Sequence, residues 1–500
     1  MAPPDVAPVE APVYFPLTGG RRFHSRANPR GPGARLIQVG RAPVPLETME
    51  EPMNRQYDLV VVGTGTASGA ASRCREAGWK VAVVDSRPVG GTCALRGCRP
   101  KKLLVSAAEA VHAPRDMAGR GILAEGLTID WPALMRFKRS EVDSLPAVFT
   151  EGYAKAGIDV IKGRARFVGS TALAVNGDRV TGRHVLIASG ARPAPLGVPG
   201  EELVATSDRF LDLDTLPPRI VFVGGGFISF EFAHVAVRAG VDVTILHRGS
   251  RPLEGFDPDL VALLVKRTRE LGARVELSTA VTGVERTASG LAVLGRSPGG
   301  ERRFEADLVI HGAGRMPDLD DLDLAAGGVT RERRGVSVNQ YLQSSSNPAV
   351  YAAGDAAASG PPLTPKAGHD TEVVASNLLE GNHRVPSYEA IASAVFTVPA
   401  LAAAGLTEEA ARAKGLRFRT QWQETSSWFS SKRVGETASG FKTLVEVGTD
   451  RILGAHLLGP HAEEVINLFA MAMRFGLKAG DVKQMLFAYP TSASDVPFML

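Results

Sequence analysis

The chain has 500 residues, of which 44% are hydrophobic, and its 57 Lys and Arg against 53 Asp and Glu give a net charge of +4. This length predicts about three domains, and a charge excess so small and dispersed argues against nucleic acid or an anionic membrane as a partner. No apolar run approaches the roughly 18 residues that a membrane span needs, and the N-terminus lacks the apolar core of a secretory signal.

Cysteine usage narrows both the compartment and the chemistry. Three cysteines in 500 residues cannot form a structural disulfide framework. We therefore expect a cytoplasmic, reducing setting, in which a close pair of cysteines is more typical of catalysis or metal binding than of a structural link.

The first 52 residues differ in composition from the rest of the chain. They hold 10 of the 33 prolines and show no hydrophobic periodicity. Such a segment buries too little apolar surface to offset its conformational entropy, so we predict a disordered N-terminal extension.

Two units of strand, glycine turn, helix and strand follow. Strands are expected at 57–62 and 81–85 in the first unit, and at 220–223 and 242–247 in the second. Strands that alternate with helices predict parallel sheets with right-handed crossovers. The C-terminal part instead has the pattern of antiparallel strands over 435–458, followed by an amphipathic helix.

The first glycine turn has the features of a dinucleotide fingerprint. Gly63 permits the tight turn, Gly65 lets the backbone approach a pyrophosphate, and Ser68 is small enough to replace the third glycine. Asp85 ends the next strand about 20 residues later, where a carboxylate would hold a ribose hydroxyl pair. The alternative is a small-residue turn in an unrelated α/β protein.

The second turn, with Gly224, Gly226 and Ser229, differs at the end of its second strand. Arg248 and Arg251 stand where the first unit has an acid. Because an adenosine 2′-phosphate needs cations and a ribose hydroxyl pair needs an acid, this pattern favours NADPH over NADH. The alternative is that both arginines are solvated surface charges.

The segment around Cys93 and Cys98 carries most of the chemistry. Cysteines five apart on an ideal helix have Cα atoms about 8.6 Å apart, whereas a disulfide needs less than about 7 Å. We therefore expect Cys93 at or before a distorted first turn, with Gly90, Gly91 and Gly97 relieving the backbone.

The neighbours of the cysteines favour redox chemistry. A helix N-terminus together with Arg96, Arg99, Lys101 and Lys102 lowers a thiol pKa. Inert buried thiols do not fit so many cations, and a metal site lacks further ligands because Cys74 is the only other cysteine. No metal is expected.

These motifs together resemble those of the pyridine nucleotide-disulfide oxidoreductase family, which includes glutathione reductase, dihydrolipoamide dehydrogenase and mercuric reductase. The likeness runs from about residue 57 to 495. It is carried by the two glycine turns and by the segments GGTC-x4-C-x-P-K-K from Gly90, ASGARP from Ala188, GRMP from Gly314 and VYAAGD from Val350.

The resemblance implies a fold and a division of the chain. It implies an α/β protein with two doubly wound dinucleotide-binding domains, for FAD and NAD(P), and a C-terminal α+β dimerisation domain. The expected boundaries are 1–54 for the disordered extension, 55–203 and 332–385 for two parts of the FAD domain, 204–331 for the NAD(P) domain, and 386–500 for the interface domain.

The resemblance also implies site residues. Cys98 lies against the isoalloxazine, Cys93 faces substrate, and Asp355 contacts the ribityl–phosphate region. Glu231 partners the lysine near flavin N5, which is Lys101 or Lys102. Phe227 matches an aromatic that gates the flavin, and the remaining motif residues expected at the cofactors are Gly91, Thr92, Gly190 and Gly314.

The chain departs from the family at its C-terminus. The family ends in His-Pro-Thr-x-x-Glu, with the histidine acting as acid/base in the partner subunit's site. Here Tyr489 replaces the histidine and Ser494 the glutamate. A phenol with an ordinary pKa near 10 can donate a proton but is a poor base at pH 7, so Tyr489 either acts as an acid or merely lines the site.

A second departure concerns the acceptor. Arg73 matches an arginine that contacts glutathione in glutathione reductases, but Glu372 replaces another and would repel a glutathione carboxylate. We therefore predict a homodimeric, FAD-dependent NADPH oxidoreductase that passes electrons through Cys93 and Cys98 to a disulfide or other small electrophile. The alternatives are a flavin-level reductase of quinones, metal ions or oxygen, and a redox sensor with little turnover.

Overall fold

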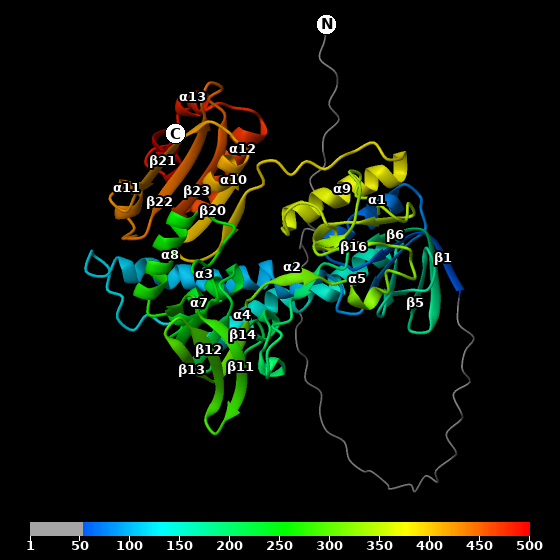
Figure 1. The fold of residues 1–500 in the computed structure, drawn as a ribbon, viewed down its shortest axis with the longest axis horizontal. Coiled ribbons are helices and arrows are strands. Elements are labelled where there is room, and N and C mark those ends of the chain that lie inside the picture. Colours follow the sequence, from blue (N-terminus) through cyan, green and yellow to red (C-terminus); the bar gives the residue numbers. More distant parts are fainter. Residues whose placement is uncertain (1–53) are drawn as a thin grey trace, which may run out of the picture. The chain divides into compact units, whose positions relative to one another are not determined.

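The computed structural model describes residues 54–500 of the chain (Figure 1). The disorder predicted for 1–52 lies outside the described residues. Within the described part, four main sheets carry the architecture: a seven-stranded sheet, a four-stranded parallel sheet, a three-stranded antiparallel sheet and a five-stranded antiparallel sheet. Two-stranded ribbons, β15 (Arg315–Pro317) with β7 (Ala191–Pro193) and β16 (Arg331–Glu332) with β17 (Gly335–Val336), complete the strand pairing.

The first sheet is built around a buried central strand. Its strand order is β3-β2-β1-β6-β5-β4, and β18 adds to β6. Leu59, Val60 and Val61 are fully buried, as expected of a strand covered on both faces. The strands are β1 (Asn54–Val62), β2 (Val81–Asp85), β3 (Asp159–Lys162), β4 (Arg166–Phe167), β5 (Ala172–Val175), β6 (Asp178–Ile187) and β18 (Val350–Ala352).

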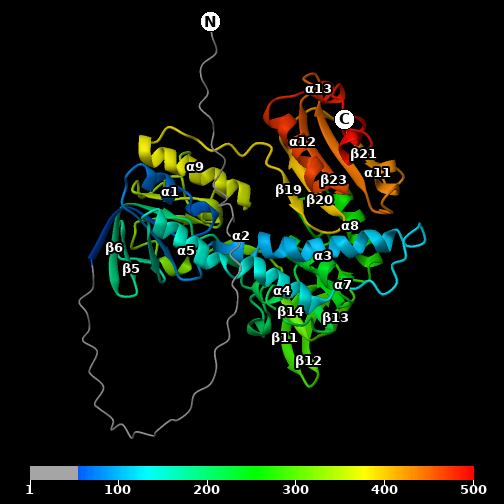
Figure 2. The same cartoon turned by 180° about the vertical axis from the view of Figure 1, so that it is seen from behind.

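Residues far apart in the sequence complete this sheet. Strand β18 pairs with β6 in parallel, with Val350 opposite Val185. Helices α1 (Ala70–Glu76) and α9 (Thr364–Glu380) lie together over one face, as Figures 1 and 2 both show, and pack Ala70 and Val374 against Leu59. The segment after residue 331 therefore returns to the sheet that the first glycine turn belongs to.

The second parallel sheet has different layers on its two faces. Its order is β10-β9-β8-β14. Phe222 and Ile245 pack on the side of α7 (Phe227–Arg238) and α8 (Pro258–Glu270), whereas Val221 packs against Val293 and Phe304 of the antiparallel sheet. The strands are β8 (Arg219–Val223), β9 (Asp242–Leu246), β10 (Arg274–Glu276) and β14 (Leu308–His311), with β11 (Ala280–Thr287), β12 (Gly290–Ser297) and β13 (Gly300–Ala306) opposite.

The C-terminal part is an antiparallel sheet with one helix packed on it. The strand order is β19-β20-β23-β22-β21, and α12 (Ala462–Arg474) buries Val465 and Phe469 against it. The strands are β19 (Ser393–Val395), β20 (Ala400–Gly405), β21 (Phe418–Glu424), β22 (Gly440–Glu446) and β23 (Ile452–Gly459), and the short helices are α10 (Glu408–Ala413), α11 (Phe429–Lys432) and α13 (Ala479–Lys483).

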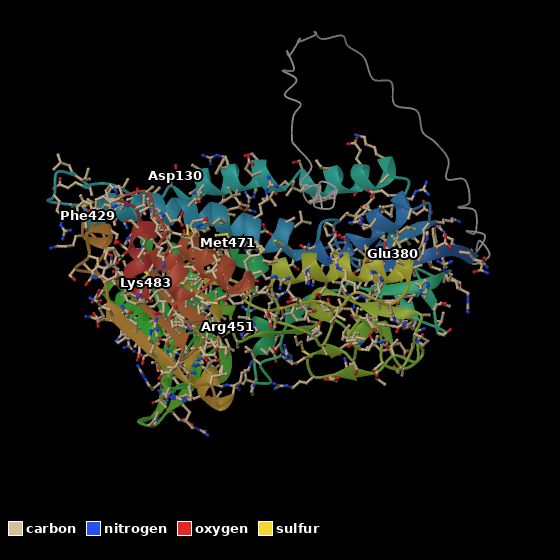
Figure 3. All side chains as sticks on the ribbon, turned by 90° about the horizontal axis from the view of Figure 1, so that it is seen from above. Asp130, Glu380, Phe429, Arg451, Met471 and Lys483 are labelled. Atoms are coloured by element: carbon tan, nitrogen blue, oxygen red, sulfur yellow. The ribbon has the colours of Figure 1, made fainter. Side chains whose placement is uncertain are left out.

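Large apolar side chains are exposed on this part of the chain. Met471 on α12 is 45% exposed (Figure 3), Phe475 76% and Leu486 99%. Exposed apolar side chains gathered in one domain are typical of a protein interface. Among residues 54–500, no helix is long and apolar enough to cross a membrane.

Candidate active site

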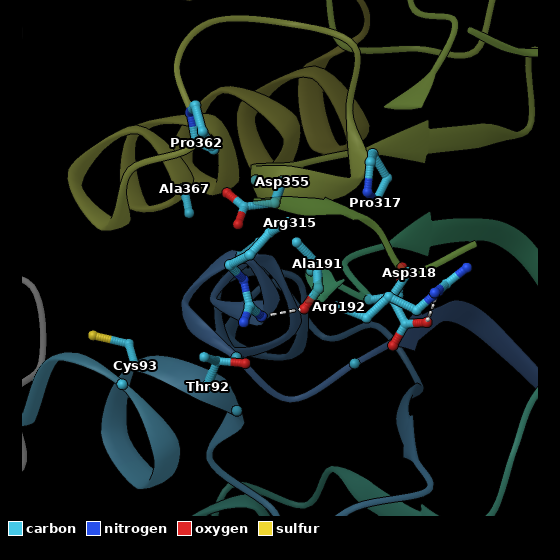
Figure 4. Close-up of a pocket in the computed structure, with 18 of the residues that line it drawn as sticks. Thr92, Cys93, Ala191, Arg192, Arg315, Pro317, Asp318, Asp355, Pro362 and Ala367 are labelled. Carbon is cyan, nitrogen blue, oxygen red and sulfur yellow. Dashed lines mark hydrogen bonds and ion pairs between the residues drawn. The ribbon is translucent and has the colours of Figure 1, made fainter. Parts of the chain in front are cut away.

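A cavity of about 890 Å³ runs past the first glycine turn and both cysteines. Most of the residues that the sequence assigns to FAD and to redox chemistry line it (Figure 4). They are Gly63, Gly65, Asp85, Gly91, Thr92, Cys93, Cys98, Lys101, Gly190, Gly226, Phe227, Glu231, Gly314 and Asp355. The lining does not include Ser68, Lys102, Gly224, Ser229, Arg248, Arg251 or Tyr489.

Two glycine segments form the floor of this cavity. Gly63 has φ +107°, and a Cβ there would lie 2.3 Å from the Ala188 oxygen. Gly91 has φ +70°, and its Cβ would lie 2.3 Å from the Gly65 Cα. Only glycine fits at these positions, so backbone amides line the cavity here and can approach a pyrophosphate. The cradle fits a dinucleotide.

The side chains around the first turn are held by hydrogen bonds. Asp85 Oδ2 accepts from Thr64 N at 3.0 Å and from its hydroxyl at 2.6 Å. Ser68 Oγ donates to the Gly65 oxygen at 2.6 Å and lies 2.9 Å from the hydroxyl of Tyr153, on α5 (Leu145–Lys155). Ser68 therefore stabilises the turn through these hydrogen bonds, and it is not part of the cavity lining.

Arg315 and Asp355 both line the cavity, and Figure 4 shows the Arg315 guanidinium directed toward Ala191. The guanidinium donates to the Ala191 oxygen. Burial lowers the pKa of Arg315, although Asp355 opposes that shift. Burial also raises the pKa of Asp355, while the cations Lys366 and Arg315 oppose it. The two side chains offer a donor and an acceptor to one ligand.

The cysteines stand on two separate helices. Cys93 lies in α2 (Gly91–Arg96) and Cys98 begins α3 (Cys98–Asp116). Cys93 lies in the first turn of α2 and ahead of α3, as the expectation of a distorted turn requires, and the break between the two helices falls at Gly97. A Cβ on Gly97 would lie 3.0 Å from the Thr92 oxygen. The break takes the sulfurs out of the straight helical geometry that would hold them apart.

The two thiols have opposite tendencies to ionise. The hydrogen bond with Cys93 lowers the pKa of Cys98 to about 6, helped by Thr364 and Lys101. The same interaction, together with burial, raises the pKa of Cys93 well above its usual value. Thr364 Oγ1 lies 3.5 Å from the Cys93 sulfur and 3.4 Å from that of Cys98. When the reduced pair loses its first proton, the negative charge therefore resides on Cys98.

Thr364 is a site residue that the sequence argument did not single out. It opens α9 within Leu363-Thr364-Pro365, and a hydroxyl beside a proline at a helix start was the signal available. Its oxygen is the one side-chain hydroxyl shared by both sulfurs in the described part of the chain.

Only one of the two candidate lysines reaches Glu231. Lys101 Nζ lies 2.8 Å from Glu231 Oε2 and 2.9 Å from Oε1. Lys102 Nζ instead lies 2.7 Å from Glu109 Oε1, at the surface. Glu231 is 1% exposed, and burial raises its pKa while Lys101 opposes the shift. Lys101 and Glu231 are thus a buried pair at the cavity wall.

Aromatic rings complete the surroundings of this pair. The Lys101 ammonium lies 4.7 Å from the centre of the Phe396 ring and 5.9 Å from that of Phe227. The Phe396 amide donates to Glu231 Oε1 at 2.8 Å. Phe227 is 47% exposed and lines the cavity. A ring in this position can cover a flat ligand.

The second glycine turn resembles the first in its backbone. Gly224 has φ +108°, and its Cβ would lie 2.4 Å from the Ala313 Cα. Ser229 is fully buried, and its hydroxyl has no hydrogen-bond partner among the described residues. Arg248 is exposed and Arg251 half-buried just beyond β9. Within 54–500 neither guanidinium pairs with a carboxylate, so both are free to meet an anion.

The two residues that bear on glutathione recognition pair with each other. Arg73 donates to Glu372 Oε2 at 2.6 Å, from α1 to α9. Both side chains are about half exposed. The cation that the family uses for a glutathione carboxylate is therefore neutralised within the chain.

Tyr489 projects from the surface of the C-terminal part. It is 82% exposed. Ser494 pairs with Thr491 in a capping box rather than with the tyrosine. Among the described residues no side chain positions the Tyr489 hydroxyl, and the structure does not bring it to the cysteines of its own chain.

Family models match most of the chain. Residues 57–371 match the pyridine nucleotide-disulphide oxidoreductase model, and residues 391–498 match the dimerisation domain of that family. The second match supports a homodimer.

Curated relatives cover nearly the same length. The chain is 34% identical to a glutathione reductase of Burkholderia cepacia over 88% of this chain and 97% of that protein. It is 30% identical to a mercuric reductase of Lysinibacillus sphaericus (87% and 81%) and to a dihydrolipoyl dehydrogenase of Geobacillus stearothermophilus (87% and 94%).

A solved structure has the same fold. The HOCl-induced flavoprotein disulfide reductase RclA from Escherichia coli superposes with a TM-score of 0.78 at 27% identity, over 88% of this chain and 98% of that one. Its Cu(II) complex superposes with a TM-score of 0.79. The chain therefore belongs to the pyridine nucleotide-disulphide oxidoreductase family, whose members are enzymes that use FAD and a pyridine nucleotide.

Proposed function

We propose that this enzyme takes electrons from NADPH and delivers them, through FAD and the Cys93–Cys98 pair, to a small disulfide or another electrophile. The observation that carries the proposal is the asymmetry of the pair. Cys98 has a pKa lowered to about 6 by its hydrogen bond with Cys93, and both thiols line the cavity that fits the dinucleotide. A thiolate at neutral pH is the reactive form of cysteine.

The residues of this chain divide the work. A bound flavin would supply the two-electron step between the nicotinamide and the cysteines. Lys101, held by Glu231, places a positive charge at the cavity wall, where it stabilises an electron-rich partner. Thr364 hydrogen-bonds both sulfurs. Cys93 would attack the acceptor as its proton passes to the hydrogen-bonded Cys98 thiolate. Cys98 would then attack Cys93 to re-form the disulfide, giving its proton to the departing thiol.

NADPH is favoured over NADH as the donor. Arg248 and Arg251 follow β9 with no carboxylate partner among residues 54–500. A doubly charged 2′-phosphate gains charge-assisted hydrogen bonds from such guanidinium groups, and NADH has no phosphate there.

The acceptor is unlike glutathione disulfide. The Arg73–Glu372 ion pair engages the arginine that matches a glutathione-contacting one, and places a carboxylate beside it. Tyr489 lacks the basicity of a histidine, so the acceptor needs little general-base help. We therefore place neutral or cationic disulfides ahead of anionic ones.

A second candidate is a metal ion. The structural relative RclA has been solved as a Cu(II) complex. Reducing a metal ion requires no protonation of a departing thiolate, which fits the loss of histidine at position 489. Electrons would still pass through the cysteine pair.

The test is a panel of acceptors assayed by NADPH oxidation: cystamine, cystine, glutathione disulfide, a quinone and Cu(II). We expect turnover with cystamine or Cu(II) that Cys93→Ser and Cys98→Ser both abolish. We also expect Glu372→Arg to gain activity with glutathione disulfide. Quinone turnover that survives both cysteine variants, with no other acceptor used, would contradict the proposal.

A further inference from the structure

A buried ion pair lies in the first turns of α9, beside the cofactor cavity. Lys366 Nζ lies 2.8 Å from Asp370 Oδ2, and the two side chains are 1% and 0% exposed. Lys366 is the third residue of the helix, where an ammonium group meets the positive end of the helix dipole. Burying both charges also costs desolvation. Stability alone therefore does not account for the pair.

The pair holds the backbone of one residue, Gly354, through the peptide groups on either side of it. Lys366 Nζ donates to the Gly354 oxygen at 2.8 Å, and Asp370 Oδ2 accepts from the Gly354 amide at 2.9 Å. Tyr388 donates from its hydroxyl to Asp370 Oδ1 at 2.7 Å. Each buried polar group thus has a partner, and the shared target is the backbone of residue 354.

Gly354 directly precedes Asp355, whose carboxylate lies at the cavity wall. Lys366, Gly354 and Asp355 all line the cavity. Gly354 has φ +64°, and a Cβ there would lie 3.0 Å from the Ala67 Cβ of the first glycine turn. Burial raises the pKa of Asp355, and Lys366 is the first of the groups that oppose the shift.

We infer that Lys366 and Asp370 are positioning residues of the flavin site, which clamp the Gly354 backbone and so aim Asp355 into the cavity. Lys366 also lends its charge to the cavity wall. The inference concerns FAD alone and does not depend on the acceptor or on the choice between NADPH and NADH.

The test compares two buried pairs that differ in location. Lys366→Met with Asp370→Asn removes the lysine half of the clamp and both charges together, so no lone charge stays buried. The control is Lys442→Met with Asp257→Asn. Lys442 Nζ lies 2.9 Å from Asp257 Oδ2, the side chains are 4% and 0% exposed, and neither residue lines the cavity. FAD release from each holoenzyme on dilution is followed by flavin fluorescence.

We expect the clamp variant to raise the FAD dissociation constant about 10- to 100-fold, the size of one lost charge-assisted hydrogen bond. The control should stay within about threefold of the unmodified protein. Binding by the clamp variant should also fall on acidification at a higher pH, because the loss of Lys366, which lowers the pKa of Asp355, outweighs the loss of Asp370, which raises it. The charged groups facing Asp355 are Arg315, Lys366 and Asp370.

Equal losses of FAD in the two double variants would show a general folding effect and overturn the inference, as would unchanged affinity in the clamp variant. Should the clamp variant fail to fold, Tyr388→Phe loosens Asp370 without removing a charge. An increase of about threefold or more in the FAD dissociation constant would then support the clamp, and an unchanged constant would overturn it.

Discussion

Cys93 and Cys98 share a hydroxyl partner but sit in different electrostatic surroundings. Cys98 begins a helix and has Lys101 one turn further along, whereas Cys93 lies in a short helix where burial opposes its charge. A coupled pair of this kind titrates as a unit, with one proton leaving at low pH and the second held. The reduced enzyme should therefore carry one thiolate over most of the neutral range.

The first prediction concerns that thiolate. Two-electron-reduced enzyme should show a thiolate-to-flavin charge-transfer absorbance that appears as the pH rises through about 6, because the pKa of Cys98 is lowered to about 6. Cys93→Ser should show the band without reductant. In Cys93→Ala the midpoint should move upward, since the hydrogen bond from residue 93 is lost.

The sign for stability follows from the same shift. A group whose pKa is depressed on folding stabilises the folded form above its unfolded pKa, near 9, and loses that contribution as the pH falls through 6. Reduced enzyme should thus melt at a lower temperature at pH 5 than at pH 9, relative to Cys98→Ser.

A charge-transfer band that survives in Cys98→Ser would contradict the assignment of the thiolate to Cys98.

The second prediction separates two adjacent lysines. Lys101→Met leaves Glu231 buried without its partner, at a cost of about 3–5 kcal/mol in the free energy of unfolding. Lys102→Met breaks an exposed pair with Glu109 and should cost about 0–1 kcal/mol. Denaturant unfolding measures both, and anaerobic stopped-flow measures flavin reduction. Comparable losses in the two variants would mean that the buried pair has no special role.

At the scale of helices and strands, regular patterns in the sequence were sufficient for some elements. Strands β1 and β2 are parallel neighbours. They could be predicted because strands covered on both faces appear as continuous apolar runs, and because the tight turn after β1 requires a glycine at residue 63. The predicted antiparallel strands at 435–458 are confirmed as β22 and β23, which begin and end a few residues later.

Other features depend on contacts between distant segments. The choice of Lys101 over Lys102 depends on which face of α3 meets α7. The pairing of Arg73 with Glu372 joins residues 299 apart in the sequence. No local periodicity encodes such partners, so sequence patterns could identify the residue types at the site but not their pairing.

The third prediction concerns the loop after β9. Arg248→Glu replaces a free cation with an anion, so NADPH should lose about 1.5–3 kcal/mol of binding, roughly 10- to 100-fold in KM, while NADH should not. The control is Arg417→Glu, another exposed arginine in the C-terminal part. Steady-state kinetics with both nucleotides measure the preference. Equal efficiency with NADH in the unmodified enzyme would refute a 2′-phosphate site.

At the scale of the whole molecule, the exposed apolar side chains of the C-terminal part need a cover. Phe475, Leu486 and Phe498 are 76%, 99% and 69% exposed, and residues 391–498 match a dimerisation domain. Tyr489 lies in the same stretch. A second copy of the chain that covers this surface would therefore also cover Tyr489.

The fourth prediction tests what that tyrosine does. Tyr489→Phe should cost less than tenfold in kcat with the true acceptor, because an essential acid would cost about 10²–10⁴-fold. Tyr489→His with Ser494→Glu should raise turnover of simple disulfides near neutral pH, since imidazole protonates a departing thiolate better than phenol. Turnover is measured from pH 6 to 9.

A loss above about a thousandfold in Tyr489→Phe, with no gain in the double variant, would make the phenol the essential acid. Tyr489→Phe leaves the apolar ring in place, so the comparison isolates the hydroxyl. Size-exclusion chromatography of each variant checks that the dimer persists.

Helix α3 carries Cys98 at its N-terminal end and a cluster of paired charged side chains near its C-terminal end. It spans 19 residues, about 28 Å of straight helix. At its far end Asp116 lies 2.6 Å from Arg267 on α8, and His112 lies 3.1 Å from Glu436 of the C-terminal part. These contacts hold the C-terminal end of α3 against two other parts of the chain.

The two thiols are already hydrogen-bonded, so any backbone shift that disulfide closure requires should fall on the shorter of the two helices. Closing and opening the disulfide should shift the six-residue helix α2, pivoting at Gly97, while α3 stays where it is. The enzyme would cycle between its redox forms with the strain confined to one short turn of chain. Gly91 begins helix α2 and also lines the dinucleotide cavity. A shift of α2 would therefore change the shape of that cavity between the oxidised and the reduced enzyme.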